Sequence, residues 1–508
     1  MEKNRLFVLK GLSIFLGTIL AVTQASAQNT VKKIDSLVTA YYTEHELSGN
    51  ILVADHGRVI YQRSLGYADV GRKILNNEHH SFQIASISKV FTSVAIMQLQ
   101  EKGKLKLDDP IRKYLPDFPF DQITIRGLLS HTSGLNDYHV FQAPHKADPD
   151  KIFTNDDIIP AIKNDKQGIV GKPGELWNYS NIGYSLLAMT VEKISGMSFS
   201  DYLAKFIFKP SGMAHTYISS SLKPSEDKDL TQNYDYVNYD PGRLKNVDSV
   251  ADDKVGHIIL RGMYGNSNIV STTEDLLRFD RALYTGKLLK QATLQQAFVP
   301  EKLNSGKPDQ GRWNDGTTVY YGLGWGTLSD TSMGKVVYHT GGMPGTSTIF
   351  IRDISHDQTI IVLDNITHYN VRAAAFNILR LLNNQPLHHY KLPLARIYTE
   401  SLVNKGADDA LARFNELKTD TANYYLDEGE MNGLAYGMLF DNHAPEALEV
   451  FRLNTLLFPG SWNAYDSYAE TLARNGKKEA AILMYRKAVE LNPKDEDGKN
   501  ALKQLEGK

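Results

Sequence analysis

Residues 82–103 read FQIASISKVFTSVAIMQLQEKG, and we expect the rest of the fold to form around this stretch. A short extended lead-in reaches the tetrapeptide SISK at 86–89. Apolar side chains then recur at the spacing of a helix that is buried on most sides. The sequence therefore predicts a helix that begins near Ser86 and ends before Gly103, a residue suited to the position after a helix C-terminus.

Ser86 and Lys89 are the chemically notable pair in this helix. Lys89 lies one turn beyond Ser86, so its ammonium can reach the Ser86 hydroxyl. A lysine in so apolar a segment needs a partner or a lowered pKa. A serine activated by such a lysine is one of the known nucleophiles of acyl transfer. The alternative is an ordinary first-turn serine followed by a lysine that extends to solvent, and the residues alone favour neither. Ser-x-x-Lys also begins at Ser220, Ser225 and Ser332, but of these four serines only Ser86 opens an apolar helix.

Length and composition indicate one large folded domain and a second module. The 508 residues are 42% hydrophobic and 22% charged, which suits a substantial core and excludes a disordered chain. The formal net charge of −2 gives no reason to expect nucleic acid or an anionic membrane surface as a partner. The chain contains no cysteine, which excludes disulfides, thiolate metal sites and cysteine nucleophiles.

Residues 1–27 have the pattern of a secretory signal peptide. Basic residues precede an apolar run from 11 to 22, and Ala-Ser-Ala at 25–27 supplies a small-residue cleavage site. The apolar run is short for a membrane-spanning helix, and a signal anchor is the alternative. We therefore expect the mature chain to begin at Gln28 and to be secreted, either into the periplasm or out of the cell.

The region up to residue 385 predicts an antiparallel sheet and a helical lobe. An early hairpin and a late meander of four strands are expected to join in one sheet, with a ligand cleft between the sheet and the mainly helical middle of the chain. The polar segment 218–256 is expected to form a surface loop or, alternatively, a flap over the cleft. The predicted strands span 50–54, 59–64, 322–327, 335–339, 346–352 and 358–363, and the predicted helices include 31–41, 182–191, 272–283 with Thr273 as N-cap, and 371–382.

The composition becomes helical after a linker at 386–392, and a repeat appears. Ala447 and Phe451 recur 34 residues later as Ala481 and Tyr485. This is the period of tetratricopeptide repeats, in which small residues lie where paired helices touch. The sequence thus predicts a repeat module that could recruit a protein or peptide partner, and a plain helical cap is the alternative. The expected domains are a signal peptide (1–27), a first domain (28–385), the linker (386–392) and helical repeats (393–508).

Three further segments carry polar groups that could meet at one site. Tyr-Ser-Asn at 179–181 precedes a predicted helix, although Tyr-x-Asn also begins at Tyr236 and Tyr264. His-Thr-Gly at 339–341 ends a predicted strand. His131 lies in LLSHTSGL, and we interpret it as a helix-end histidine bonded to local backbone in preference to a catalytic base.

Taken in order, SISK at 86–89, YSN at 179–181 and HTG at 339–341 resemble the three-motif set of the serine β-lactamase and penicillin-binding-protein superfamily. The resemblance is to its class C β-lactamase-related branch, of which LLSHTSGL at 128–135 is typical, and it covers about residues 30–385. It implies an α/β (α+β) fold of the β-lactamase/transpeptidase type. In that fold an antiparallel sheet is flanked by helices and faces an all-helical lobe.

The resemblance also implies a role for each motif residue. Ser86 would be the acylated nucleophile, and Lys89 and Tyr179 would share the proton transfers. The backbone N–H groups of Ser86 and Gly342 would form the oxyanion hole. Asn181 would orient Lys89 and the substrate amide, and Thr340 would bond a substrate carboxylate or carbonyl. The implied substrate-binding residues are therefore Asn181, His339, Thr340, Gly341 and Gly342.

Two departures from the family pattern bear on the substrate. His339 stands where most β-lactamases carry lysine, whereas certain D-Ala-D-Ala carboxypeptidases and related esterases carry histidine. A mostly uncharged histidine attracts a substrate carboxylate less strongly. Gly-Asn-Ser-Asn at 265–268 stands where relatives tend to be glycine-rich, which leaves the shape of that loop open.

We therefore expect a secreted, metal-independent serine hydrolase that acts through an acyl-enzyme on D-amino-acid peptides or other small amides and esters. A class C-type β-lactamase is one alternative. A non-catalytic scaffold that binds peptides through the helical repeats is another. We expect no cofactor, no nucleic-acid partner and no membrane span after signal cleavage.

Overall fold

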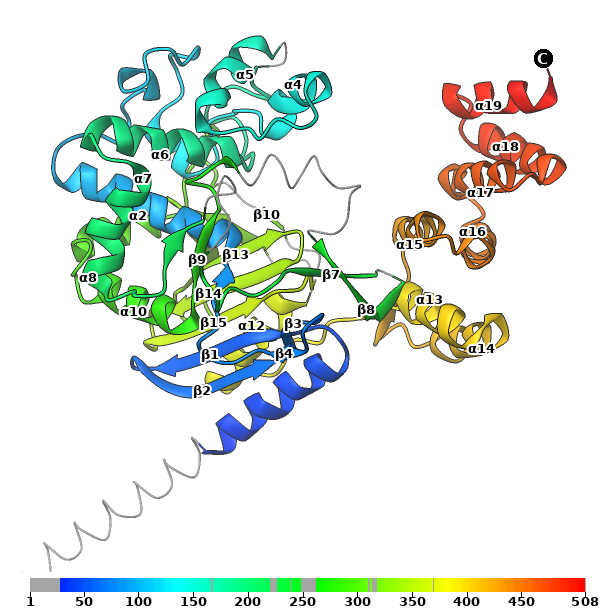
Figure 1. The fold of residues 1–508 in the computed structure, drawn as a ribbon, viewed down its shortest axis with the longest axis horizontal. Helices are drawn as coiled ribbons and strands as arrows, with labels where there is room; N and C mark the ends of the chain where they lie inside the picture. The colour runs from blue at the N-terminus through cyan, green and yellow to red at the C-terminus, as the bar shows by residue number, and fades with distance from the viewer. Residues whose placement is uncertain are drawn as a thin grey trace, which may run out of the picture. The chain divides into compact units, whose positions relative to one another are not determined.

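The structure is a computed structural model that describes residues 28–165, 168–219, 226–237, 239–247, 262–308, 311–312, 318–368 and 370–507. It divides into two compact units (Figure 1). The N-terminal unit comprises the described residues up to Asp235 together with Asn246–His388, and the C-terminal unit comprises Tyr236–Lys245 and the chain from His389 onward. The expected signal peptide lies outside the described residues. None of the helices that the structure describes has the length and apolar character that crossing a membrane requires.

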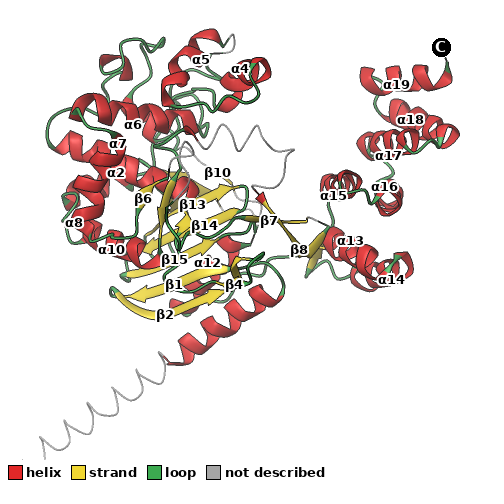
Figure 2. Ribbon diagram, viewed as in Figure 1, coloured by secondary structure: helices red, strands yellow, loops and turns green. Residues whose placement is uncertain are grey.

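An eight-stranded antiparallel sheet forms the centre of the N-terminal unit (Figure 2). Its strand order is β10-β11-β12-β13-β14-β15-β1-β2. The predicted hairpin joins the predicted meander through β1 and β15, where Asn50 pairs with Leu363. The fold predicted from the sequence is thus confirmed. The strands of this sheet are β1 (Gly49–Asp55), β2 (Arg58–Leu65), β10 (Gly311–Arg312), β11 (Thr318–Tyr321), β12 (Gly326–Leu328), β13 (Val336–Met343), β14 (Thr346–Asp353) and β15 (Gln358–Asp364).

The alternation of side chains along the central strands gives each face of the sheet its own core. In β1, Ile51 and Val53 belong to the core on one face, and Leu52 and Ala54 belong to the core on the other. The helix at residues 28–43 and α12 (Val371–Leu382) contribute to the first core. Helices α2 (Ser88–Glu101) and α10 (Thr273–Tyr284) contribute to the second. Strands covered on both faces are buried throughout, as β1 is from residue 49 to 54.

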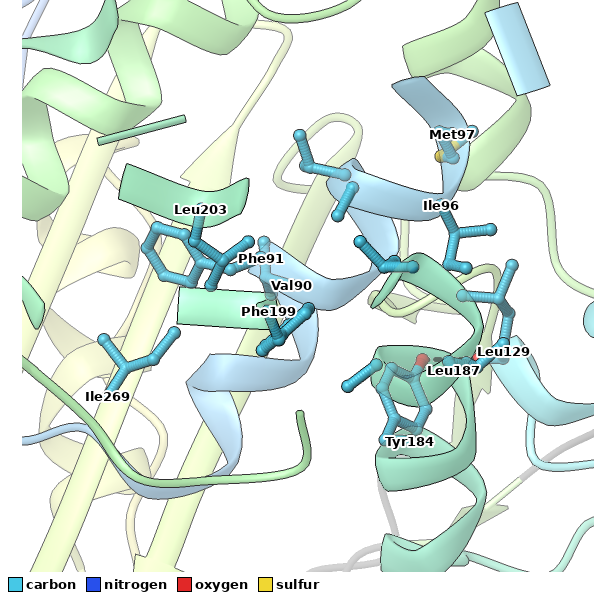
Figure 3. Packing of buried hydrophobic residues seen from close by; sticks show 14 of the residues in the cluster. Val90, Phe91, Ile96, Met97, Leu129, Tyr184, Leu187, Phe199, Leu203 and Ile269 are labelled. Atoms are coloured by element: carbon cyan, nitrogen blue, oxygen red, sulfur yellow. Dashed lines mark hydrogen bonds between the residues drawn. The ribbon is translucent and has the colours of Figure 1, made fainter. Parts of the chain in front are cut away.

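Helix α2 is the centre of the helical lobe. Its side chains are buried from Ser88 to Leu99, so it has neighbours on every side. Phe91 stacks on Phe279 of α10 with ring centroids 4.2 Å apart. Tyr184 of α6 (Asn181–Ser195) donates a hydrogen bond of 2.6 Å to the carbonyl of Leu129 (Figure 3). Packing on all sides fixes the position of the first turn of α2, where the SISK tetrapeptide lies. The other short and long helices of this unit are η1 (Ala85–Ile87), η2 (Ile111–Lys113), α3 (Ile125–Leu129), η3 (Tyr138–Phe141), α4 (Gln142–Ala147), η4 (Asn155–Asp157), α5 (Ile158–Asn164), α6 (Asn181–Ser195), α7 (Phe199–Leu203), η5 (Ala204–Phe208), α8 (Lys209–Ser211) and α11 (Gln291–Ala297).

Three predicted boundaries are wrong. The α-helix begins at Ser88, because residues 85–87 form a separate 3-10 turn. The N-cap of α10 is Thr272 in place of Thr273, since the Thr272 hydroxyl accepts the Asp275 N–H at 3.2 Å. The strand predicted to end at His339 runs on to Met343, because pairing with β14 continues to the turn.

The segment 218–256 is described only in part, since residues 220–225, 238 and 248–256 lie outside the described residues. Short strands β6 (Tyr217–Ile218), β7 (Tyr234–Val237) and β8 (Asp240–Asn246) occur in it. Residues 236–245 are not the expected surface loop, because Tyr239 is buried in the core of the C-terminal unit and its hydroxyl donates to Asp441 at 2.6 Å. Lys245 forms an ion pair with the same carboxylate. The alternative, a flap over the cleft, stays a prediction. Four small strands complete the fold: β3 (Tyr67–Asp69), β4 (Ile74–Leu75), β5 (Phe82–Gln83) and β9 (Ile269–Ser271).

The C-terminal unit is built from consecutive helices. Its boundary, between His388 and His389, falls inside the segment predicted as a linker. The small residues predicted to lie between paired helices, Ala447 and Ala481, are both fully buried. Burial alone does not distinguish repeats from another helical arrangement, so the repeat module stays a prediction. The elements are β16 (Leu392–Pro393), α13 (Leu394–Lys405), α14 (Ala407–Leu417), β17 (Tyr424–Tyr425), α15 (Glu428–Phe440), α16 (Ala444–Leu457), α17 (Trp462–Arg474), α18 (Lys478–Leu491) and α19 (Glu496–Glu506).

Candidate active site

Ser86 lies on η1, the 3-10 turn between β5 and α2. Ala85 before it has φ +46°, a left-handed conformation that costs roughly 1 kcal/mol or more for a residue with a Cβ. The surrounding structure holds this turn through Ile84, whose N–H donates to the Ile269 carbonyl at 2.9 Å and whose carbonyl accepts the Thr348 hydroxyl at 3.0 Å. The strained turn leaves the Ser86 side chain half-buried and in reach of the groups around it.

Lys89 is fully buried and has three acceptors. Its Nζ donates to Ser86 Oγ at 3.0 Å, to Asn181 Oδ1 at 2.8 Å and to the Asn266 carbonyl at 2.9 Å. Burial lowers the pKa of Lys89 from its usual 10.5 to about 7, and the nearby charge of Asp137 opposes this fall. A lysine so placed changes its protonation near neutral pH beside a serine hydroxyl.

Tyr179 lies against Lys89, whose Nζ is 4.8 Å from the centre of the tyrosine ring. Burial raises the pKa of Tyr179 well above its usual range, whereas an interaction with the Ser86 hydroxyl lowers it and the charge of Asp137 raises it further. Tyr179 is therefore a neutral phenol at pH 7, close to both Ser86 and Lys89.

His131 supports the segment that carries Tyr179. Its ring lies 4.2 Å from the Tyr179 ring, its Nδ1 accepts the Ser180 N–H at 3.1 Å, and its carbonyl accepts the Asn178 N–H at 2.8 Å. Because Nδ1 accepts, the ring proton of the neutral imidazole is on Nε2. Burial, helped by the charge of Lys89, keeps the pKa of His131 well below 6.5. The predicted local backbone partner is therefore wrong, since the backbone group that His131 binds lies 49 residues away.

Asn181 and Asp137 form a bonded pair at the start of α6. Asp137 Oδ2 accepts from Asn181 Nδ2 at 2.8 Å, and Oδ1 accepts the backbone N–H groups of Asn181 and Ile182 at 2.8 and 3.2 Å. With its Nδ2 so engaged, Asn181 turns its Oδ1 toward Lys89. Burial raises the pKa of Asp137, whereas these hydrogen bonds and the charge of Lys89 lower it.

The 265–268 loop, whose shape the sequence left open, lies directly against α2. The hydroxyl of Thr92 donates to the Gly265 carbonyl at 2.5 Å, and Ser88 Oγ accepts the Ile269 N–H at 3.2 Å. Asn268 adopts φ +71°, a left-handed conformation that asparagine tolerates better than most residues. The loop thus presents the Asn266 carbonyl to Lys89.

The HTG segment lies on β13, beside the Ser86 turn. β13 pairs with β12 through Val337 and Tyr338 only, so within the described sheet residues 339–343 have a strand neighbour, β14, on one side alone. Thr340 and Gly342 are exposed there, whereas Gly341 is buried against the turn. A Cβ on Gly341 would lie 2.3 Å from the Ile84 carbonyl oxygen.

His339 is buried beneath this edge, with 4% of its surface exposed. Its Nε2 lies 2.8 Å from the Tyr321 hydroxyl, and its Nδ1 lies 2.6 Å from the Thr340 carbonyl. Since a carbonyl can only accept, Nδ1 carries the proton and Nε2 accepts from Tyr321. Burial, with the charge of Lys89, lowers the pKa of His339 to about 3, although the hydrogen bond to Thr340 raises it. Contact of this neutral ring with a substrate stays a prediction.

Comparisons with known proteins show the family to which this chain belongs. A family model described as beta-lactamase matches residues 34–384. The chain belongs to the β-lactamase family. As a member of this family it is a serine hydrolase related to β-lactamases and penicillin-binding proteins. Penicillin-binding protein 4* of Bacillus subtilis (strain 168) is 36% identical over 344 residues, which are 66% of this chain and 72% of the relative.

Solved structures share the β-lactamase fold. The octameric penicillin-binding protein homologue from Pyrococcus abyssi has a TM-score of 0.59 and 25% identity, with 70% of this chain and 78% of that chain covered. The D-amino acid amidase from Ochrobactrum anthropi SV3, complexed with D-phenylalanine, has a TM-score of 0.57 and 24% identity over 70% of this chain and 99% of its own. At that identity the second likeness shows the fold alone.

In this β-lactamase-family site the structure brings together Ser86, Lys89, Tyr179 and Asn181, and it places Gly341 and Gly342 on the strand beside them. Their catalytic roles stay predictions. Sequence reasoning missed Asp137 and the Asn266 carbonyl. A signal for Asp137 exists, because it is the sole acidic residue between Arg126 and Lys146. A backbone carbonyl leaves no such signal. Among the residues that the structure describes, no group of three or more His, Asp and Glu side chains could hold a metal ion.

Proposed function

We propose that this chain is a secreted serine hydrolase that forms an acyl-enzyme on Ser86 and acts on D-amino-acid peptides or other small amides and esters. The observation that carries the proposal is the 3.0 Å contact between Lys89 Nζ and Ser86 Oγ, made by a lysine whose pKa burial lowers to about 7. Nucleophilic serines are activated in this way by an adjacent base.

Lys89 is the stronger candidate for the base that activates Ser86. Its neutral form is abundant near pH 7, whereas the pKa of Tyr179 is raised by burial and its phenolate is scarce. Tyr179 is better suited to pass a proton onward, because its hydroxyl lies near Ser86 while its ring lies near Lys89. General catalysis works best with a group whose pKa is near the working pH.

The reaction then follows from these positions. Neutral Lys89 takes the hydroxyl proton as Ser86 Oγ attacks the substrate carbonyl carbon. The oxyanion formed is held by the backbone N–H groups of Ser86 and Gly342. The proton on Lys89 passes through Tyr179 to the leaving amine or alcohol as the tetrahedral adduct collapses. Water hydrolyses the acyl-enzyme by the same steps in reverse order.

Two observations support a peptide-like acyl donor. The free side of β13 at residues 339–343 offers main-chain groups to an extended substrate, as strand edges do for peptides. The D-amino acid amidase that shares this fold was solved with D-phenylalanine, which makes D-amino acid amides the first substrates to test. A neutral His339 in place of a lysine weakens attraction for the carboxylate of a β-lactam, so a dedicated β-lactamase is the second candidate.

The location and the partner belong to the proposal as well. The signal-peptide pattern of residues 1–27 supports export to the periplasm or out of the cell. The 34-residue period of the C-terminal unit supports a protein or peptide partner. A chain truncated after His388 that lost neither activity, solubility nor binding partners would argue against that partner.

The substrate class is tested with matched pairs. The full chain is assayed with D- and L-phenylalanine amide, D-Ala-D-Ala peptides, a small p-nitrophenyl ester and a chromogenic cephalosporin, beside Ser86→Ala. Turnover of D-configured amides or peptides that Ser86→Ala abolishes is the expected result. Turnover of the cephalosporin alone would replace this proposal with the β-lactamase.

A further inference from the structure

We infer that Asp137 is a positioning residue of this site, which fixes the orientation of the Asn181 amide and supplies the negative charge that faces the Lys89 ammonium. The inference rests on the proposed function, because it concerns the residue that would activate Ser86. Asp137 comes from the loop after α3, whereas Lys89 is on α2 and Asn181 opens α6. Three elements distant in sequence therefore meet at one carboxylate.

The first argument is geometric. An asparagine side chain can present either its oxygen or its NH₂ group to a neighbour, and only the oxygen can accept from an ammonium. Asp137 Oδ2 accepts from Asn181 Nδ2 at 2.8 Å, which leaves Oδ1 to accept from Lys89 at 2.8 Å. The Lys89 ammonium and the Asp137 carboxylate therefore select the same orientation of the amide. Asp137 thus holds Asn181 with its oxygen toward Lys89.

The second argument is electrostatic. The groups around Lys89 are the rings of Tyr179 and Tyr184, with centroids at 4.8 and 5.6 Å, and the imidazoles of His131 and His339. All four are neutral near pH 7, because burial raises the pKa of the tyrosines and lowers the pKa of the histidines.

Asp137 is the carboxylate that acts on Lys89 through space in the described part of the chain, and its charge favours the protonated lysine. Removal of this charge should lower the pKa of Lys89 further, because the charge of Asp137 opposes the effect of burial.

The third argument excludes a simple helix cap. Asp137 Oδ1 does accept the first two N–H groups of α6, as a capping residue would. Ser180 already serves as the N-cap, however, since its hydroxyl accepts the Gly183 N–H at 3.2 Å. The second carboxylate oxygen is directed to the Asn181 side chain, which a cap does not require. A role in capping alone predicts a loss of stability and no change in the ionisation of Lys89.

Asp137→Asn tests the inference in the full-length protein. The readout is the second-order rate of Ser86 acylation by a small activated ester between pH 5 and 9, with thermal unfolding measured beside it. The wild-type rate should rise with pH through about 7, the pKa of Lys89. In Asp137→Asn the plateau rate of acylation should fall at least about tenfold. The pH at which the acylation rate rises should also decrease by about one unit, because the charge that favours protonated Lys89 is gone.

The exchange variant Asp137→Asn with Asn181→Asp supplies the matched control. It keeps one amide and one carboxylate in the pair but moves the charge to the residue that contacts Lys89. The acylation rate should recover relative to Asp137→Asn. It should rise at a higher pH than in the wild type. If Asp137→Asn reacts too slowly for a profile, this variant decides the question.

The outcomes separate the two proposals. A wild-type protein that no ester acylates contradicts the proposed function itself. Suppose the wild type is acylated and the acylation rate of Asp137→Asn rises at the same pH as that of the wild type. This result overturns the inference but not the proposed function, whether or not the plateau rate falls. A folded exchange variant without any reaction overturns it too.

Discussion

The Nζ of Lys89 lies 3.0 Å from the Oγ of Ser86, and two further acceptors, Asn181 Oδ1 and the Asn266 carbonyl, lie within 2.9 Å of the same nitrogen. An ammonium has three protons, so the charged lysine is fully bonded. A neutral amine has two protons and a lone pair. If Asn181 and Asn266 retain the two protons, the lone pair faces the Ser86 hydroxyl, so the same site serves both protonation states.

This arrangement predicts the pH profile. Because burial lowers the pKa of Lys89 to about 7, the basic form appears as the pH rises through that value, and kcat/KM should rise with it. Lys89→Arg should lower kcat/KM by at least about 100-fold, since the guanidinium stays protonated at every accessible pH. Lys102→Arg, at the exposed end of the same helix, is the control and should leave the profile unchanged. A wild-type profile that is flat from pH 5.5 to 8.5 would contradict the assignment of Lys89 as base.

Alanine substitutions at the adjacent glycines 341 and 342 of β13 should have different effects on folding and activity. A Cβ on Gly341 would lie 2.2 Å from Thr348 Oγ1 and 2.3 Å from the Ile84 carbonyl oxygen, which is main chain and cannot turn away. Gly341→Ala should therefore displace the Ser86 turn, lower the melting temperature and reduce kcat by at least about tenfold. Gly342→Ala meets nothing within 4 Å and retains its N–H, so it should fold normally and keep most of its activity. Comparable loss in both variants would show that the contact between β13 and the turn does not matter.

Replacement of His131 should lower the stability and kcat but leave the pH profile unchanged. His131→Phe keeps an aromatic ring against Tyr179 but leaves the buried Ser180 N–H without its acceptor, which costs about 1–3 kcal/mol. Chemical denaturation should show this loss, and kcat should fall because the Tyr179 segment is less firmly held. The rise of kcat/KM should stay at the wild-type pH. A shift in that rise would restore the catalytic-base interpretation of His131.

We expect Asp441 to hold residues 236–245 in place. Its carboxylate accepts the Tyr239 hydroxyl at 2.6 Å and pairs with Lys245 within the C-terminal unit. Asp441→Ala should leave both groups without that partner and speed backbone hydrogen exchange in 236–245, with the exchange of α17 and α18 unchanged. Asp409→Ala, an exposed acidic residue of α14 in the same unit, is the control. Equal exchange in all three proteins would argue that other contacts hold this segment.

The fold was largely predictable because its signals are local. The apolar run after SISK, the short apolar strand of β1 and the meander from residue 336 to 364 each follow from side-chain pattern and turn residues. The boundary at Ser86 was not predictable, since the 3-10 turn depends on Ala85 in a left-handed conformation that long-range contacts, such as those of Ile84, hold in place.

The motif residues of the site could be named from the sequence, but their surroundings could not. Asp137, the Asn266 carbonyl and the contact of His131 with Ser180 all depend on loops that meet only in the folded chain. The burial of His339 against Tyr321 likewise depends on β11, a strand that the sequence analysis did not identify. Long-range contacts of this kind leave no periodic pattern to read.

The central claim is that Ser86 is the nucleophile, and the most direct test is the intact mass of the full chain during reaction with a small activated ester and, separately, a penicillin. The account predicts a mass increase of one acyl group from the ester on the wild type, located on the peptide that contains Ser86 and absent from Ser86→Ala. With penicillin, a long-lived adduct would indicate slow deacylation, and an adduct that disappears with product release would favour a β-lactamase. No adduct from the ester on the wild type, or the same adduct on Ser86→Ala, would contradict the claim.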